Sequence, residues 1–364
     1  FGSHSVPEGW LIAAAGNPPE YNKSVREFDI VTLDRVRRMD IEADLDVWME
    51  YAWKKEIHGS ILAYLGMKKD HFYSVENTVD GKFFVTARGW EDLSEILKAY
   101  EELGVEITEN LIGEYLCRDE IARSFFASYQ LYRKYGEDYG LKRLLSGEMA
   151  EEEQQKKVKM AEGASFEERF LVTGLLLSGL NGSFLDYEKL DKETGAVYQE
   201  LLHLKAFLHD KKDMTALDEF TDVKKKSLAV RLEAELLNLE QQTTEEFVIR
   251  TLEEFSLTIR KEHITDTETG FERIRQLFTE MVEKRKDCAK KISRELERAF
   301  AFMKACFGDG QETVLFVTGL TRNSHAAAFI REYGCDPYFA CSEKLLYRKQ
   351  EKKLQEECES LLKI

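Results

Sequence analysis

The sequence predicts a mainly α-helical protein with a small α/β piece at its start, and three observations support this. Only four prolines occur in 364 residues, and Pro7, Pro18 and Pro19 lie near the start, so the strongest helix breaker is almost absent from the rest. Long stretches carry apolar residues at spacings of three and four, as helices packed on other helices do. A doubly wound sheet needs several parallel strands, and the sequence offers only about two.

The first two strand candidates lie near the start of the chain. The apolar run Trp10–Ala15 is typical of a buried strand, and Gly16-Asn17-Pro18-Pro19 ends it in a loop. Met39–Ala43 is a second strand-like piece, which follows a basic cluster at Arg35, Arg37 and Arg38.

Residues 43–135 are expected to form helices and one β-hairpin. Asp80-Gly81 between two apolar runs is a hairpin signal. The expected elements are a helix from Asp46 to about Leu65, strands at 72–75 and 82–85, a helix from Thr86 to about Leu103, and a helix from Glu109 to Tyr132. Turn-forming residues at Tyr135–Gly140 indicate a boundary there.

Residues 136–364 are expected to be dominated by long helices. The clearest runs from Phe271 to Met303 and ends before Gly308-Asp309-Gly310. A strand region near 312–320, centred on Val314–Val317, precedes a short helix near Ala326–Tyr333. A charged helix from Ser342 to about Leu362 closes the chain.

The composition of the chain argues against several classes of protein. The net charge of −16 opposes sequence-independent binding to nucleic acid, which depends on Lys and Arg contacts to phosphate. Since no run of about 18 apolar residues occurs, no membrane span is expected. The six cysteines form no C-x-x-C pair and are typical of reduced thiols. With no signal-peptide pattern at the start, the expected location is cytoplasmic.

Metal-binding and phosphate-binding motifs are missing. The seven histidines show no H-E-x-x-H pattern, so no metal site is expected. The phosphate loop G-x-x-x-x-G-K-S/T and a strand ending in paired acids are also absent, which taken alone argues against an ATP hydrolase. Residues 318–324 could bind an anion at a helix start, but a connection capped by Asn323 or Ser324 is favoured.

Three segments within residues 1–130 nevertheless resemble the MoxR branch of AAA+ ATPases. GWLIAAAGNPPEYN at 9–22 is similar to the family's sensor-1 strand and loop. VTLDRV at 31–36 is similar to its leucine-aspartate-arginine segment, and VTARGWEDL at 85–93 falls where the family has its sensor-2 arginine. The order and spacing of the three segments make this resemblance specific, and it does not extend to residues 140–364.

The resemblance implies a role for one residue in each segment. Asn17 would position the attacking water and contact the γ-phosphate, because a neutral amide can orient but not deprotonate. Arg35 would be the arginine finger that reaches a neighbouring subunit's nucleotide, with Arg37 and Arg38 as alternatives. Arg88 would contact the nucleotide of its own subunit and couple its presence to the lid.

The resemblance also implies an architecture and an activity. Residues 1–42 would be the last strands of a truncated AAA+ core, 43–135 its helical lid, and 136–364 a helical extension. The intact family protein would form rings, use ATP and Mg²⁺, and remodel protein clients in a chaperone-like way. Without a phosphate loop, which we interpret as a missing front part, this chain alone is expected to bind no nucleotide tightly and to hydrolyse no ATP.

Two other functions compete with this one. A non-catalytic helical scaffold or protein-interaction module would keep the sensor-like loops without nucleotide. A nucleic-acid-associated regulator is the least favoured alternative, because the acidic charge balance opposes phosphate contacts.

Overall fold

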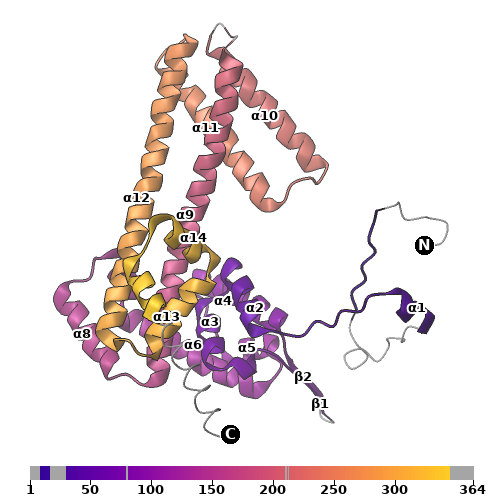
Figure 1. Ribbon diagram of the computed structural model, residues 1–364, viewed down its shortest axis with the longest axis vertical. Helices are drawn as coiled ribbons and strands as arrows, with labels where there is room; N and C mark the ends of the chain where they lie inside the picture. The colour runs from indigo at the N-terminus through magenta and orange to yellow at the C-terminus, as the bar shows by residue number, and fades with distance from the viewer. Residues whose placement is uncertain (1–8, 17–29, 79–80, 210, 212, 345–364) are drawn as a thin grey trace, which may run out of the picture. The chain divides into compact units, whose positions relative to one another are not determined.

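The computed structural model describes residues 9–16, 30–78, 81–209, 211 and 213–344 (Figure 1). The chain forms two units, Phe1–Ala43 and Asp44–Ile364, which are described separately below. The described residues are mainly helical, with 79% helix in 14 helices and one two-stranded sheet. The predicted mainly α class is confirmed.

The described part of the first unit contains one short helix, α1 (Ile30–Arg35), and otherwise irregular chain. The prediction of a buried strand at Trp10–Ala15 is wrong: these residues form no strand, and Trp10 and Leu11 are 73% and 91% exposed. Met39–Ala43 is also irregular and exposed. An apolar run becomes a strand only where a partner strand satisfies its backbone groups, and the described residues of this unit provide none.

The second unit begins with two helices where the sequence predicted one. These are α2 (Leu45–Lys54) and α3 (Gly59–Met67). Between them Glu56 has a φ of 54°, a left-handed conformation that a continuing helix cannot contain. Asp44 caps α2 and His58 caps α3, each accepting hydrogen bonds from backbone N–H groups of the first turn.

The predicted hairpin is confirmed. After a short 3₁₀ turn (η1, Lys69–His71), β1 (Ser74–Thr78) pairs antiparallel with β2 (Gly81–Val85), with Ser74 opposite Val85 and Thr78 opposite Gly81. Asp80 of the expected turn lies outside the described residues. The next helix, α4 (Ala87–Leu103), is also confirmed, and it ends at Gly104 with a φ of 66°.

The helix predicted over 109–132 is divided into α5 (Glu109–Tyr115) and α6 (Asp119–Tyr139). The residues between them pair with the hairpin, because the Phe84 N–H donates to the Cys117 carbonyl at 3.2 Å. The expected boundary near 135/136 falls inside α6. Large buried side chains from both sides of it, such as Phe125 and Leu176, belong to one hydrophobic core.

Four further helices form most of the remaining chain, after the short α7 (Leu141–Ser146) and α8 (Glu151–Glu162). They are α9 (Phe166–Leu208), α10 (Thr215–Glu233), α11 (Leu239–Lys261) and α12 (Thr267–Phe307). The long helix predicted at 271–303 is thus confirmed as part of α12. The two longest helices, α9 and α12, run side by side (Figure 1).

The described residues of the second unit form two larger hydrophobic cores, and α9 and α12 contribute to both. We call the larger one the body; it includes the first half of α9 and the second half of α12. We call the smaller one the arm; it joins α10 and α11 to the second half of α9 and the first half of α12. The buried residues of the arm are Val197, Leu201, Leu204, Leu208, Met214, Ala216, Leu217, Phe220, Val248, Leu252, Phe255, Ile259 and Ile274.

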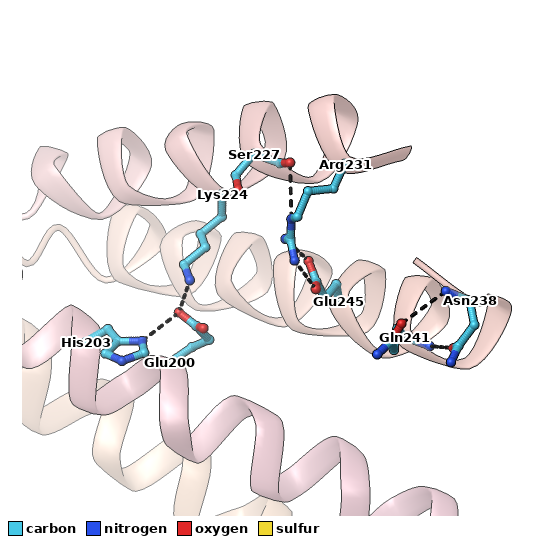
Figure 2. Close-up of polar contacts among 8 residues, drawn as sticks. All are labelled: Glu200, His203, Lys224, Ser227, Arg231, Asn238, Gln241 and Glu245. Atoms are coloured by element: carbon cyan, nitrogen blue, oxygen red, sulfur yellow. Dashed lines mark hydrogen bonds and ion pairs between the residues drawn. The ribbon is translucent and has the colours of Figure 1, made fainter. Parts of the chain in front are cut away.

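Polar contacts also hold the arm together (Figure 2). Lys224 of α10 reaches Glu200 of α9 at 2.6 Å, and Arg231 of α10 pairs with Glu245 of α11. Asn238 starts α11 with a capping box, in which its side chain and that of Gln241 each accept the other's backbone N–H.

The prediction of a strand near 312–320 is wrong, because the segment is a helix, α13 (Gln311–Arg322). Its buried residues Glu312, Thr313, Phe316, Val317 and Leu320 recur at helical spacing. A short apolar run such as Val314–Val317 fits a strand and a buried helix equally well, so its pattern did not decide between them. The following helix, α14 (Ser324–Tyr333), agrees with the prediction.

Two other expectations concern membranes and the end of the chain. Among the described helices, none combines the length and the apolar character that a membrane span requires. Residues 336–344 are helical, and the rest of the charged helix expected up to Leu362 lies outside the described residues.

Candidate functional site

Asn17, the expected sensor-1 residue, lies outside the described residues. Arg35 is the last residue of α1, and its side chain is exposed. A cation at a helix C-terminus is favourable because the last carbonyls carry partial negative charge. The position of Arg35 therefore has an ordinary structural explanation within its own unit.

The two alternatives to Arg35 differ in their contacts. Arg38 donates from Nε to Asp40 at 2.8 Å, and both side chains are more than two-thirds exposed. Arg37 is exposed, and within the described residues neither Arg35 nor Arg37 has a hydrogen bond or ion pair. The guanidinium groups of Arg35 and Arg37 are thus open to a further partner. Arg38, by contrast, already pairs with the exposed Asp40.

Arg88 lies in the first turn of α4, where three neighbouring residues fix the backbone. Thr86 caps the helix and accepts the Gly89 N–H at 3.2 Å. Gly89 allows a close approach, since a Cβ there would lie 2.8 Å from the Tyr115 carbonyl oxygen. Trp90 is fully buried and donates from its indole to the Phe72 carbonyl at 3.1 Å. Arg88 is therefore presented to solvent from a rigid support.

The electrostatics of this turn are unfavourable for an arginine. The first turn of α4 contains no acidic residue, and its free N–H groups carry partial positive charge. Within the described residues, Arg88 has no hydrogen bond or ion pair. A cation at this end of a helix lowers stability by about 0.3–1 kcal/mol. The helix start thus opposes an arginine at this position, and Asp92 four residues later offsets part of that cost; an anionic ligand would be favoured by both the arginine and the helix start.

The first carboxylate after Arg88 has another partner. Glu91 accepts a hydrogen bond from the Tyr51 hydroxyl of α2 at 2.7 Å. This hydrogen bond is the main reason that the pKa of Tyr51 rises to about 12. The contact joins α4 to α2.

Comparison with known protein families, curated proteins and solved structures finds no match to this chain. The interpretation of Arg88 therefore depends on the local geometry and on the sequence segments described above.

The structure also assembles a polar cluster that the sequence reasoning missed. His58 lies between Ser60, whose hydroxyl is 2.7 Å from Nδ1, and Glu101, whose carboxylate is 3.2 Å from Nε2. Tyr129 donates to the same carboxylate at 2.8 Å. Ser60 is only 1% exposed, so its hydroxyl cannot reach a substrate. The cluster holds the start of α3 against α4 and α6, and no local motif could have revealed it because its members are far apart in sequence.

Metal binding has no support in the described residues, which contain no group of three or more His, Cys, Asp or Glu placed to hold an ion. The described cysteines are unpaired thiols, and burial raises the pKa of Cys306 to about 12, which disfavours its reactive thiolate. The exposed arginines, and Arg88 in particular, remain the best candidates for ligand contact.

Proposed function

We propose that this chain is the nucleotide-sensing and lid portion of a MoxR-type AAA+ ATPase, which uses ATP to remodel protein partners. The observation that carries the proposal is Arg88, an exposed arginine in the first turn of α4 with no partner among the described residues. It occupies the place of the sensor-2 arginine in the segment that resembles this family. The helix start around it adds to its attraction for an anion.

The chemistry assigned to the three residues follows from phosphoryl transfer. ATP with Mg²⁺ would supply the reactive γ-phosphate, on whose oxygens negative charge is stabilised by guanidinium groups. Arg88 would bind phosphate of its own subunit's nucleotide, and α4 would transmit that contact to the helices packed on Trp90 and Leu93. Arg35 would act on a neighbouring subunit's nucleotide, and Asn17 would orient water.

Binding of a fluorescent ATP analogue tests the proposal. We expect weak binding by the 364-residue chain, measured with protein in excess, and a loss on the order of tenfold in Arg88→Ala, since a charge-assisted hydrogen bond to phosphate is removed. Arg294→Ala is the matched control, because Arg294 is an exposed arginine in the middle of α12. Equal binding by all three proteins would refute the sensor role of Arg88.

Hydrolysis provides a second test. We expect the chain alone to hydrolyse no ATP, because the phosphate loop and the acidic strand end are absent from its sequence. Turnover by the purified chain that Arg35→Ala abolishes would contradict this expectation.

A second candidate function, a helical protein-interaction module, is favoured by exposed leucines where α10 meets α11. Leu236, on the connection between α10 and α11, and Leu239, the first residue of α11, are 68% and 78% exposed. Exposed leucines at the end of a helical hairpin suit contact with another protein. Nucleotide-analogue binding that does not depend on Arg88, together with partner binding that depends on these leucines, would favour this function.

A further inference from the structure

Between the body and the arm, α9 and α12 pass through a segment without a hydrophobic core. In 188–195 of α9 and 282–287 of α12, all of which are described, no hydrophobic residue is buried or packs against either core. We call residues 188–195 of α9 and 282–287 of α12 the neck. Since hydrophobic packing does not fix the two helices here, other contacts must decide whether the arm keeps one direction relative to the body.

A chain of polar and charged side chains crosses the neck from α14 to the arm. His325 of α14 contacts the carboxylate of Glu188 through Nδ1. Lys192, one turn further along α9, lies 2.8 Å from Glu188 and 2.6 Å from Glu240 in the first turn of α11. Burial alone would raise the pKa of Glu188, but hydrogen bonds from Lys192 and His325 outweigh it and lower that pKa.

A second chain of contacts joins α14 to α12 and α9. Arg285 of α12 donates to Glu332 of α14 at 3.0 Å and also pairs with Asp191 of α9. Its guanidinium lies 5.5 Å from the centre of the Tyr187 ring. The Tyr187 hydroxyl is in turn 2.6 Å from that of Tyr333. Arg285 is about three-quarters buried, so these contacts are less screened by solvent than surface ion pairs.

The opposite side of α14 is anchored in the body. Ala326, Phe329 and Ile330 are at most 2% exposed and belong to the body's core. His325 and Glu332 are seven residues apart, which puts them on one face of the helix, two turns from each other. One short helix thus has an apolar face fixed in the body and a polar face that contacts both long helices of the neck.

We propose that α14 is a clasp that fixes the direction of the arm relative to the body. Without it, α9 has a weak point in the neck: Gly195 lowers helix stability there, and a Cβ at this position would meet no atom within 4 Å, so close packing does not require the glycine. The Thr194 hydroxyl next to it donates to the Leu190 carbonyl, a contact that favours bending of helices. Release of α14 lets the arm swing about this point.

The distance between a label on the body and a label on the arm tests the clasp. Nitroxide-bearing residues introduced in place of Leu103, at the end of α4, and Leu236, on the connection between α10 and α11, are both exposed and report this distance by pulsed electron paramagnetic resonance. The otherwise unaltered chain should give a narrow distance distribution. His325→Ala combined with Glu332→Ala should broaden it, and amide exchange at 188–195 should accelerate about tenfold.

Two further variants keep the test decisive. Glu332→Gln preserves shape, and should broaden the distribution less than the double variant even if that variant folds poorly. Glu262→Ala, which removes an ion pair with Arg273 inside the arm, should leave the distribution narrow. An unchanged distribution in Glu332→Gln and in the double variant, at unchanged helix content, would show that the long helices alone set the arm's direction and would overturn the proposal.

Discussion

Asn323, which caps α14, donates from its side-chain amide to the Oδ1 atom of Asn181 in α9 at 2.6 Å, and both side chains are buried. The Oδ1 atom of Asn323 accepts the backbone N–H groups of His325 and Ala326 at 3.0 and 3.1 Å. The Asn323 side chain therefore caps the start of α14. It also attaches the junction between α13 and α14 to α9. The sequence left Asn323 and Ser324 as alternative caps, and the structure has Asn323 in this role.

Asn323→Ala is expected to destabilise the protein by about 2–3 kcal/mol, since it removes a helix cap and leaves the buried Asn181 acceptor without its donor. Chemical denaturation measures this loss. Asn238→Ala is the matched control, because Asn238 caps α11 in the same way but is exposed (Figure 2); it should cost about 1 kcal/mol. Equal losses would show that the buried contact to Asn181 contributes nothing.

Gly89→Ala should destabilise the protein by about 1–3 kcal/mol, because a Cβ 2.8 Å from the Tyr115 carbonyl oxygen forces α4 away from α5. The backbone carbonyl cannot turn aside as a flexible side chain could. Gly113→Ala, inside α5, meets no atom within 4 Å and should stabilise by up to about 1 kcal/mol. Thermal unfolding of the two variants should therefore shift in opposite directions; a stabilised Gly89→Ala protein would contradict the close approach.

The sequence was a good guide where periodicity was long and turn chemistry was specific. The stripe from Phe271 to Met303 has too many helical repeats to fit any other element, and it forms α12. The hairpin and α4 were also foreseeable, because strand, turn and cap signals agree around 74–86. Arg88 could be placed at a helix start for the same reason.

Other features depend on tertiary contacts that no local pattern contains. The break between α2 and α3 requires Glu56 in a left-handed conformation, which its residue type does not suggest. Val314–Val317 is helical because Phe316 and Val317, with Leu320 one turn further on, pack in the body, although the same run suits a strand. The pairing of His58 with Glu101, and of Arg285 with Asp191 and Glu332, joins residues too distant in sequence for any spacing rule.

Glu101 should make stability depend on acid pH. Burial alone would raise the pKa of this carboxyl, but hydrogen bonds from His58 and Tyr129 outweigh burial and hold the pKa below its ordinary value of 4.5. A carboxyl with a lowered pKa in the folded state stabilises the protein above its unfolded pKa, and the contribution is lost as pH falls through the folded value.

To isolate this contribution, the free energy of unfolding of the original protein is compared with that of the Glu101→Gln variant. The difference between the two should be largest near about pH 7 and should shrink as pH falls from about 4.5 toward about 3. A difference that stays constant across this range would show that the Glu101 charge does not stabilise the cluster.

Arg88→Ala should have opposite effects on stability and on binding. Removing a cation from the first turn of α4 relieves its repulsion with the helix N-terminus, so the variant should be more stable by about 0.3–1 kcal/mol at low ionic strength, with the gain declining as salt is added. The same substitution should weaken binding of the ATP analogue. Thermal unfolding and analogue titration on one preparation measure both effects. A residue kept for folding would lose stability on substitution, and a residue kept for a phosphate ligand would lose only binding, so a destabilised Arg88→Ala protein with intact binding would exclude the sensing role.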